Sequence, residues 1–256
     1  MGGLIEGDLG ESYQFDGRPV ADILKESIPV TLTMGFLALV LAVGVGFPAG
    51  IYAASRHDRA ADSALRGFAM VGVSLPSFLL APILILVFSS GWPLNWLWPS
   101  GLAYMLSSGW LLPSALWLGP TYWIFPVLTL AVRPAAFILR LTRASFLDKV
   151  SSDFVRTARG KGLGMLSIFY RHLLKNSIGP VLAYGGPLIA GLFSGSFVVE
   201  IIFAVPGVAK YFVQSIFYRD YPLIMGLTLF FSCCLLIGNL ISDCLLKIID
   251  SQAEVG

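Results

Sequence analysis

Charged residues are scarce in this sequence, and residues that reactive sites require are scarcer still. Asp, Glu, Lys and Arg make up 12% of the 256 residues, about half of the roughly 25% found in soluble domains. There are two His and three Cys, and no cluster of His, Cys, Asp or Glu has the spacing of a metal site. Gly160-Lys161-Gly162 lacks both the spacing and the hydroxyl of a phosphate-binding loop. We therefore expect no catalytic residue, no metal and no cofactor bound by this chain.

Long apolar runs are what the sequence has in abundance. Hydrophobic residues make up 56% of the chain. A membrane-spanning helix needs roughly 20 mostly apolar residues, because its backbone groups must pair with one another in hydrocarbon. The sequence therefore predicts an all-α, polytopic membrane protein. We expect five transmembrane helices, at about 29–55, 66–90, 121–142, 178–199 and 222–243.

Lys and Arg are distributed unevenly between the predicted connections. With Arg133 left aside, four fall in one set of connections and twelve in the other. Because basic residues in short connections favour the cytosolic side, we expect residues 1–28 outside, and the loop 143–176 and the C-terminus in the cytosol. All six Trp lie between Trp92 and Trp123. There we favour a connection at headgroup depth over a Trp-lined ligand site.

The loop 143–176 alternates charged and apolar residues at helical spacing. A first predicted helix carries an apolar face made of Leu147, Val150, Phe154 and Ala158. Three closely spaced glycines follow, and a second helical pattern begins after them. The loop fits basic interfacial helices on anionic lipid headgroups, and it also fits a docking element for a cytosolic protein. Periodicity alone does not separate these two interpretations.

Specific motifs favour the docking element. The loop reads Asp153-Phe-Val-Arg-Thr-Ala-Arg-Gly-Lys-Gly-Leu163 and then Arg171-His-Leu-Leu-Lys-Asn176. It resembles the cytosolic loop of binding-protein-dependent ABC importer permeases, most closely the oligopeptide and dipeptide subfamily. The resemblance extends over most of the chain. Its further motifs are Gly7-Asp-Leu-Gly-Glu-Ser12, Pro29-Val-Thr-Leu32, Arg140-Leu-Thr-Arg-Ala-Ser145, Glu200-Ile-Ile-Phe-Ala-Val-Pro-Gly207, Arg219-Asp-Tyr-Pro222 and Asn239 through Asp243.

The resemblance implies a permease domain of the type I ABC importer class over 29–256, in a bacterial cytoplasmic membrane. It also implies that the loop couples the chain to a separate ATPase, which would bind ATP and Mg. The implied partners are a second homologous permease subunit, two ABC ATPase subunits, an external substrate-binding protein and membrane lipid, with no nucleic acid. The residues that it places at the ATPase docking surface are Asp153, Phe154, Arg156, Thr157, Ala158, Arg159, Gly162 and Leu163.

Two further regions are candidates for the translocation pathway. Residues 200–221 resemble the family's re-entrant outer segment, and the alternative is an ordinary external loop. The gate residues expected there are Glu200, Phe203, Pro206 and Gly207. Arg133 lies within the third predicted span, where an ionisable group is costly. It suits the carboxylate of a peptide, and it also suits a side chain that snorkels toward the cytosolic headgroups, so both interpretations stay open.

In the family a further spanning helix precedes the Gly-Asp-Leu-Gly pattern, which here starts at Gly7. We therefore expect a chain without the family's first span, through truncation, an internal start or a genuine five-span design. The favoured function is the permease subunit of a peptide importer, forming half of the translocation pathway. The alternatives are an ATP-independent secondary transporter and a truncated remnant that transports nothing.

Overall fold

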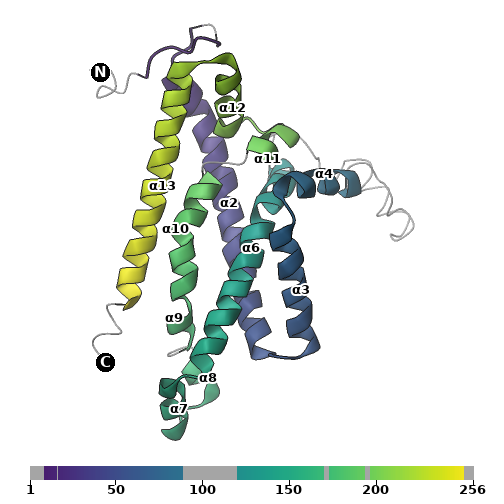
Figure 1. The fold of residues 1–256 in the computed structure, drawn as a ribbon, viewed down its shortest axis with the longest axis vertical. Helices are drawn as coiled ribbons and strands as arrows, with labels where there is room; N and C mark the ends of the chain where they lie inside the picture. The colour runs from purple at the N-terminus through teal and green to yellow at the C-terminus, as the bar shows by residue number, and fades with distance from the viewer. Residues whose placement is uncertain (1–8, 16, 89–119, 170–172, 194–196, 251–256) are drawn as a thin grey trace. The chain divides into compact units, whose positions relative to one another are not determined.

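The computed structural model describes residues 9–15, 17–88, 120–169, 173–193 and 197–250. Regular structure in these residues is helical, apart from one isolated antiparallel bridge between Glu11 and Pro19, so the predicted all-α class is confirmed. Most of the predicted Trp-rich connection, residues 92–119, lies outside the described residues. The helices, shown in Figure 1, are α2 (Val20–Ser55), α3 (Ala60–Ser74), α4 (Ser77–Phe88), α6 (Pro120–Val150), α7 (Asp153–Gly160), α8 (Met165–Ile168), α9 (Leu174–Ser177), α10 (Gly179–Phe193), α11 (Phe197–Ile202), α12 (Val208–Tyr218) and α13 (Tyr221–Asp250).

Four helical stretches in the described part of the chain are long and apolar enough to cross a membrane, or five if a bent pair counts as one span. The four are Val20–Ser55, Tyr122–Val150, Gly179–Ile202 and Tyr221–Ile248. The bent pair is α3 and α4, which cover most of the predicted span 66–90. The break falls at Leu75 and Pro76. Pro76 has no N–H to continue the ladder of α3, and its carbonyl accepts the first hydrogen bonds of α4.

The chain forms two compact units, which we describe separately: 1–38 with 75–131 and 190–235, and 39–74 with 132–189 and 236–256. In the first unit, α2 begins at Val20 rather than at residue 29. The early start follows from packing, because one face of the first turns of α2 is buried, although these turns are polar enough to escape a hydropathy criterion. The buried residues of this cluster are Val20, Ile23, Leu24, Val208, Leu223 and Leu227.

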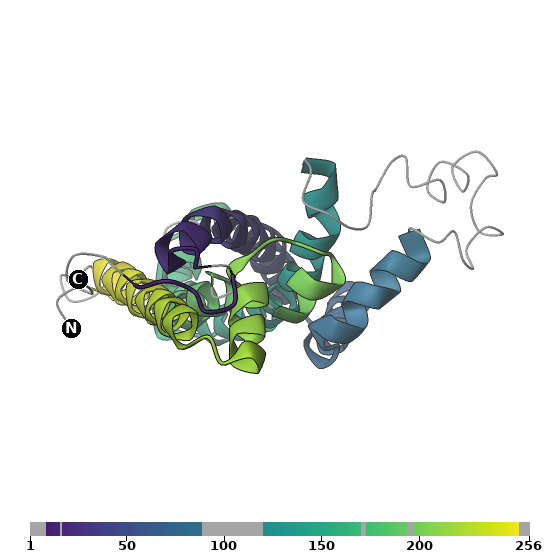
Figure 2. The same ribbon diagram turned by 90° about the horizontal axis from the view of Figure 1, so that it is seen from above.

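The N-terminal segment of the first unit is tied to the start of α13. The Ser12 hydroxyl donates to Asp220 Oδ2 at 2.5 Å and accepts from the Phe15 N–H at 3.1 Å. Asp220 Oδ1 also accepts from the Leu223 N–H at 3.4 Å, which caps α13. Ser12 and Asp220 are 2% and 0% exposed. In Figure 2 the N-terminal segment accordingly lies beside the first turns of α13.

Small residues bring the helices of the second unit close together. A Cβ added at Gly46 of α2 would lie 2.5 Å from the Ala135 carbonyl oxygen of α6, and one at Gly50 would lie 2.6 Å from Thr142 Cβ. Side chains larger than glycine at either position would force α2 and α6 apart. Close approach through small residues is a common way for membrane helices to associate, since lipid supplies no hydrophobic drive between them.

Candidate functional site

The predicted docking loop begins as a continuation of α6. Its apolar positions up to Val150 belong to that long helix, and α7 begins at Asp153 after a break at Ser151 and Ser152. The expectation that one helix runs through these positions is wrong. The break has a local cause, because the Ser152 hydroxyl donates to the Lys149 carbonyl at 2.5 Å and so competes with the helical ladder.

One face of α7 packs on the chain itself, within the second unit. Val155 and Ala158 are 1% and 5% exposed. They belong to an apolar cluster, here called the α7 cluster, whose buried members are Ala54, Phe146, Val155, Ala158, Ile168 and Leu173. Figure 1 shows α7 and α8 beside the end of α6. Ala158, one of the residues predicted at the docking surface, faces this cluster, where its small apolar side chain fits the close packing.

The opposite face of α7 is open to solvent. Asp153, Arg156 and Thr157 are exposed, and the side chains of Asp153 and Arg156 are 98% and 80% exposed. Their N···O distance is 3.8 Å, and an ion pair this exposed contributes little to stability. Both side chains therefore remain available for a partner. Phe154 and Arg159 lie in the same helix, and their side chains are outside the described part.

The turn after α7 depends on a glycine. Gly162 has a φ of 76°, which glycine adopts without a steric penalty. The Leu163 N–H donates to the Ala158 carbonyl at 3.2 Å, which closes the end of the helix, and Leu163 is 37% exposed. The turn leads to α8 and α9, which both lie within the second predicted helix, and residues 170–172 between them are outside the described residues.

A buried ion pair joins α3 to α6 in the second unit. Arg143 Nε and Nη2 donate to the two carboxylate oxygens of Asp62 at 2.6 and 2.8 Å. Asp62 also accepts from the Asp58 N–H at 3.1 Å, and Arg66 Nε lies 3.7 Å from Asp62 Oδ1. The Asp62 side chain is 0% exposed and that of Arg143 is 16% exposed. Two parallel donors on one carboxylate fix orientation as well as distance, so the pair sets the position of α6 about two turns before that helix ends.

In the first unit, the predicted gate residue Glu200 caps the N-terminus of α12. Its carboxylate accepts from the Lys210 N–H at 3.0 Å and from the Thr31 hydroxyl at 3.1 Å. Thr31 Oγ1 accepts in turn from the Val208 N–H at 2.9 Å. Glu200 is 0% exposed, so it connects α11, α12 and α2 and does not face an open path. A buried carboxylate is tolerated there because donors surround it.

The other predicted pathway residues have different surroundings. Phe203 is 0% exposed, and Pro206 is exposed. A Cβ at Gly207 would lie 2.5 Å from both Glu200 Cδ and Thr31 Oγ1, so only glycine fits beside the cap. Arg133 belongs to α6 in the second unit, and its side chain is exposed. The structure therefore assembles Glu200, Phe203 and Gly207 in one unit and leaves Arg133 in the other.

Residues 46–255 match the family described as the binding-protein-dependent transport system inner membrane component. The chain belongs to this family. Two curated relatives are similar along almost all of this permease. It is 37% identical to the dipeptide transport system permease protein DppB of Bacillus subtilis over 98% of this chain and 76% of that protein. It is also 37% identical to the oligopeptide transport system permease protein OppB of Salmonella typhimurium over 97% of this chain and 76% of that protein.

Solved structures agree with the fold of this permease. A chain of the MetNI methionine ABC transporter in an inward-facing conformation matches with a TM-score of 0.66, at 15% identity, over 90% of this chain and 97% of that chain. A chain of an amino acid ABC transporter matches with a TM-score of 0.54, at 16% identity. These similarities establish that the predicted ABC importer type of permease fold is correct.

Sequence reasoning missed Asp62, the buried centre of the permease's α3–α6 contact. One signal was present, because Asp62 is an acidic residue in the first turn of α3, four residues before Arg66. That spacing predicts only a surface ion pair. The partner that matters, Arg143, is 81 residues away in sequence. In the part of the chain that the structure describes, no group of three or more His, Cys, Asp or Glu is placed to hold a metal ion.

Proposed function

We propose that this permease subunit forms half of the translocation pathway of an ATP-driven peptide importer and is coupled to a separate ATPase through the exposed face of α7. The observation that carries the substrate class is the 37% identity to a dipeptide permease along 98% of the chain. The partners in this proposal are a second homologous permease, two ATPase subunits that bind ATP and Mg, and an external binding protein. The chain itself hydrolyses nothing.

In this proposal, the packing of α7 couples the ATPase to the membrane helices. Its outer face offers Asp153, Arg156 and Thr157 to a partner, while Val155 and Ala158 contact the ends of α2 and α6 through the α7 cluster. Close-packed interiors are nearly incompressible. A displacement of the docked face is therefore transmitted to the two long helices and is not absorbed by the loop. In this proposal α7 faces the cytosol, as the distribution of Lys and Arg predicts.

The outer segment 200–221 has a complementary role in the proposal. The Glu200 cap holds α11, α12 and α2 together, so the segment moves as one piece. A stiff segment of this kind is suited to open or close an external gate when the two permeases change their relative orientation. Glu200 then acts as a positioning residue and does not contact the peptide.

The test is reconstitution of the full chain with its second permease, ATPases and binding protein in proteoliposomes. We expect ATP-dependent uptake of a labelled oligopeptide. Replacing Arg156→Glu reverses a charge on the exposed face of α7 and should weaken ATPase association about tenfold, because it replaces the Asp153–Arg156 pair with two like charges on that face. Co-purification and uptake are measured on the same preparations.

The matched control is Arg59→Glu, which reverses an exposed charge outside α7. It should leave association and uptake unchanged. Uptake that survives ATP depletion and follows an ion gradient would identify a secondary transporter. Failure of uptake with intact partners would identify a remnant, and an unchanged association for Arg156→Glu would remove α7 from the interface.

A further inference from the structure

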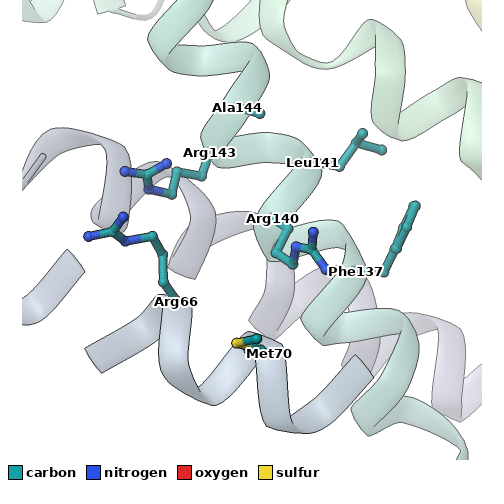
Figure 3. Close-up of a pocket in the computed structure, with 7 residues that line it drawn as sticks. All are labelled: Arg66, Met70, Phe137, Arg140, Leu141, Arg143 and Ala144. Atoms are coloured by element: carbon teal, nitrogen blue, oxygen red, sulfur yellow. The ribbon is translucent and has the colours of Figure 1, made fainter. Parts of the chain in front are cut away.

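A cavity of about 500 Å³ opens between α3 and α6 in the second unit. Its wall combines three arginines with apolar side chains, and Figure 3 shows Arg66 rising from α3 while Arg140 and Arg143 come from α6. The residues that line it are Arg66, Met70, Phe137, Arg140, Leu141, Arg143 and Ala144. This composition suits a ligand with an anionic end and an apolar end.

The cavity carries uncompensated positive charge. Arg143 and Arg66 share the carboxylate of Asp62, with N···O distances of 2.6 and 3.7 Å. For Arg140 the described part of the chain provides no hydrogen-bond or ion-pair partner. Asp62 pairs with two of the three guanidinium groups, and Asp58 adds a more distant attraction for Arg143, so the charge of Arg140 is left without a paired carboxylate among the described residues. In Figure 3 the Arg140 guanidinium extends toward Phe137, away from the other two.

The apolar part of the wall continues onto an exposed helix surface. Met70 is 70% exposed and Phe137 is 37% exposed. Two further apolar side chains of α3, Phe68 and Val71, are 76% and 57% exposed. Helix α6 lies in a candidate membrane span, and α3 belongs to the bent pair. Acyl chains can therefore cover this apolar surface in a membrane.

We infer that the cavity binds the headgroup of an anionic phospholipid, with the phosphate at Arg140 and an acyl chain along Met70 and Phe137. Guanidinium groups match phosphate oxygens in geometry as well as charge, and basic pockets between membrane helices suit anionic headgroups. The predicted topology places Arg66 and Arg140 at the cytosolic ends of their spans, at headgroup depth. A free phosphate would use the arginines but leave the apolar wall unused.

The test uses the purified full chain and native mass spectrometry. The unaltered chain is mixed with phosphatidylglycerol or phosphatidylcholine, and the retained lipid is counted. We expect selective retention of phosphatidylglycerol, an about fivefold loss of affinity in Arg140→Gln, and a comparable loss in Met70→Glu, which adds a negative charge at an exposed position. Inorganic phosphate at millimolar concentration should displace little of the lipid.

The control is Arg156→Gln, which removes one exposed charge from α7 and should retain the lipid fully. Equal losses in Arg156→Gln and Arg140→Gln would show a diffuse basic surface and overturn the site. Equal retention of the two lipids by the unaltered chain would overturn it without any variant. Complete displacement by inorganic phosphate would assign the cavity to that ligand and overturn the lipid.

Discussion

The ion pair between Asp62 and Arg143 provides the most direct test of the second unit. Asp62→Asn keeps the shape of the side chain and its bond from the Asp58 N–H, but it removes the charge that two guanidinium donors contact at 2.6 and 2.8 Å. Removing one partner of a buried pair costs about 3–5 kcal/mol, because the other charge is left buried. Since the Arg143 side chain keeps 16% exposure, it recovers some hydration. We therefore expect a loss of about 3 kcal/mol.

The measurement is the free energy of unfolding of the chain in detergent micelles, from a denaturant titration. Asp58→Asn is the matched control: it changes an acidic residue in the turn just before α3 whose side chain is 74% exposed, and Asn tolerates its φ of 60°. The control should stay within about 0.5 kcal/mol of the unaltered chain. The double variant of Asp62→Asn with Arg143→Gln should lose less than the sum of the single losses. A loss below about 1 kcal/mol, or strict additivity, would refute the coupling.

The remaining predictions concern α7 and the outer segment. Ala158→Asp should destabilise the fold by at least about 3 kcal/mol, because a carboxylate would enter the α7 cluster, whereas Thr157→Asp on the exposed face should change it by less than about 0.5 kcal/mol. Both are measured by denaturant titration, and equal effects would contradict the inward orientation of Ala158. Gly207→Ala should cost about 1–3 kcal/mol, because its Cβ displaces the Glu200 carboxylate. Gly67→Ala, with no atom within 4 Å of its Cβ, should stabilise α3 by about 0.5–1 kcal/mol, and the reverse order in unfolding titrations would contradict the capping role of Glu200.

Helix content and family were predictable because each leaves a local trace in the sequence. Apolar runs mark the parts of helices that cross hydrocarbon, and the motif from Asp153 to Leu163 marks the family. Helix boundaries leave a weaker trace. Val20 begins α2 in a stretch that contains charged residues, so an apolar run could not locate that start. Pro76 divides one apolar run into two helices, and hydropathy alone does not register such a break.

Which face of α7 is buried was less predictable, since it depends on tertiary contacts. Ala158 shares helical spacing with Phe154 on the sequence, but spacing does not say whether a face meets a partner or the chain itself. The same limit applies to Glu200. Its carboxylate suggests a gate when it is seen at the end of a span, and only the positions of Thr31 and Lys210 identify it as a helix cap. Long-range pairs such as Asp62 with Arg143 leave no local pattern at all.

The α7 cluster also bears on the thermodynamics of assembly. Because Val155 and Ala158 are buried in the isolated chain, the helix that we propose as the ATPase contact is already ordered without a partner. Binding therefore involves none of the conformational entropy loss that accompanies folding on binding. We expect association through α7 to show a small heat capacity change for its area, and a rate limited by the orientation of two rigid surfaces.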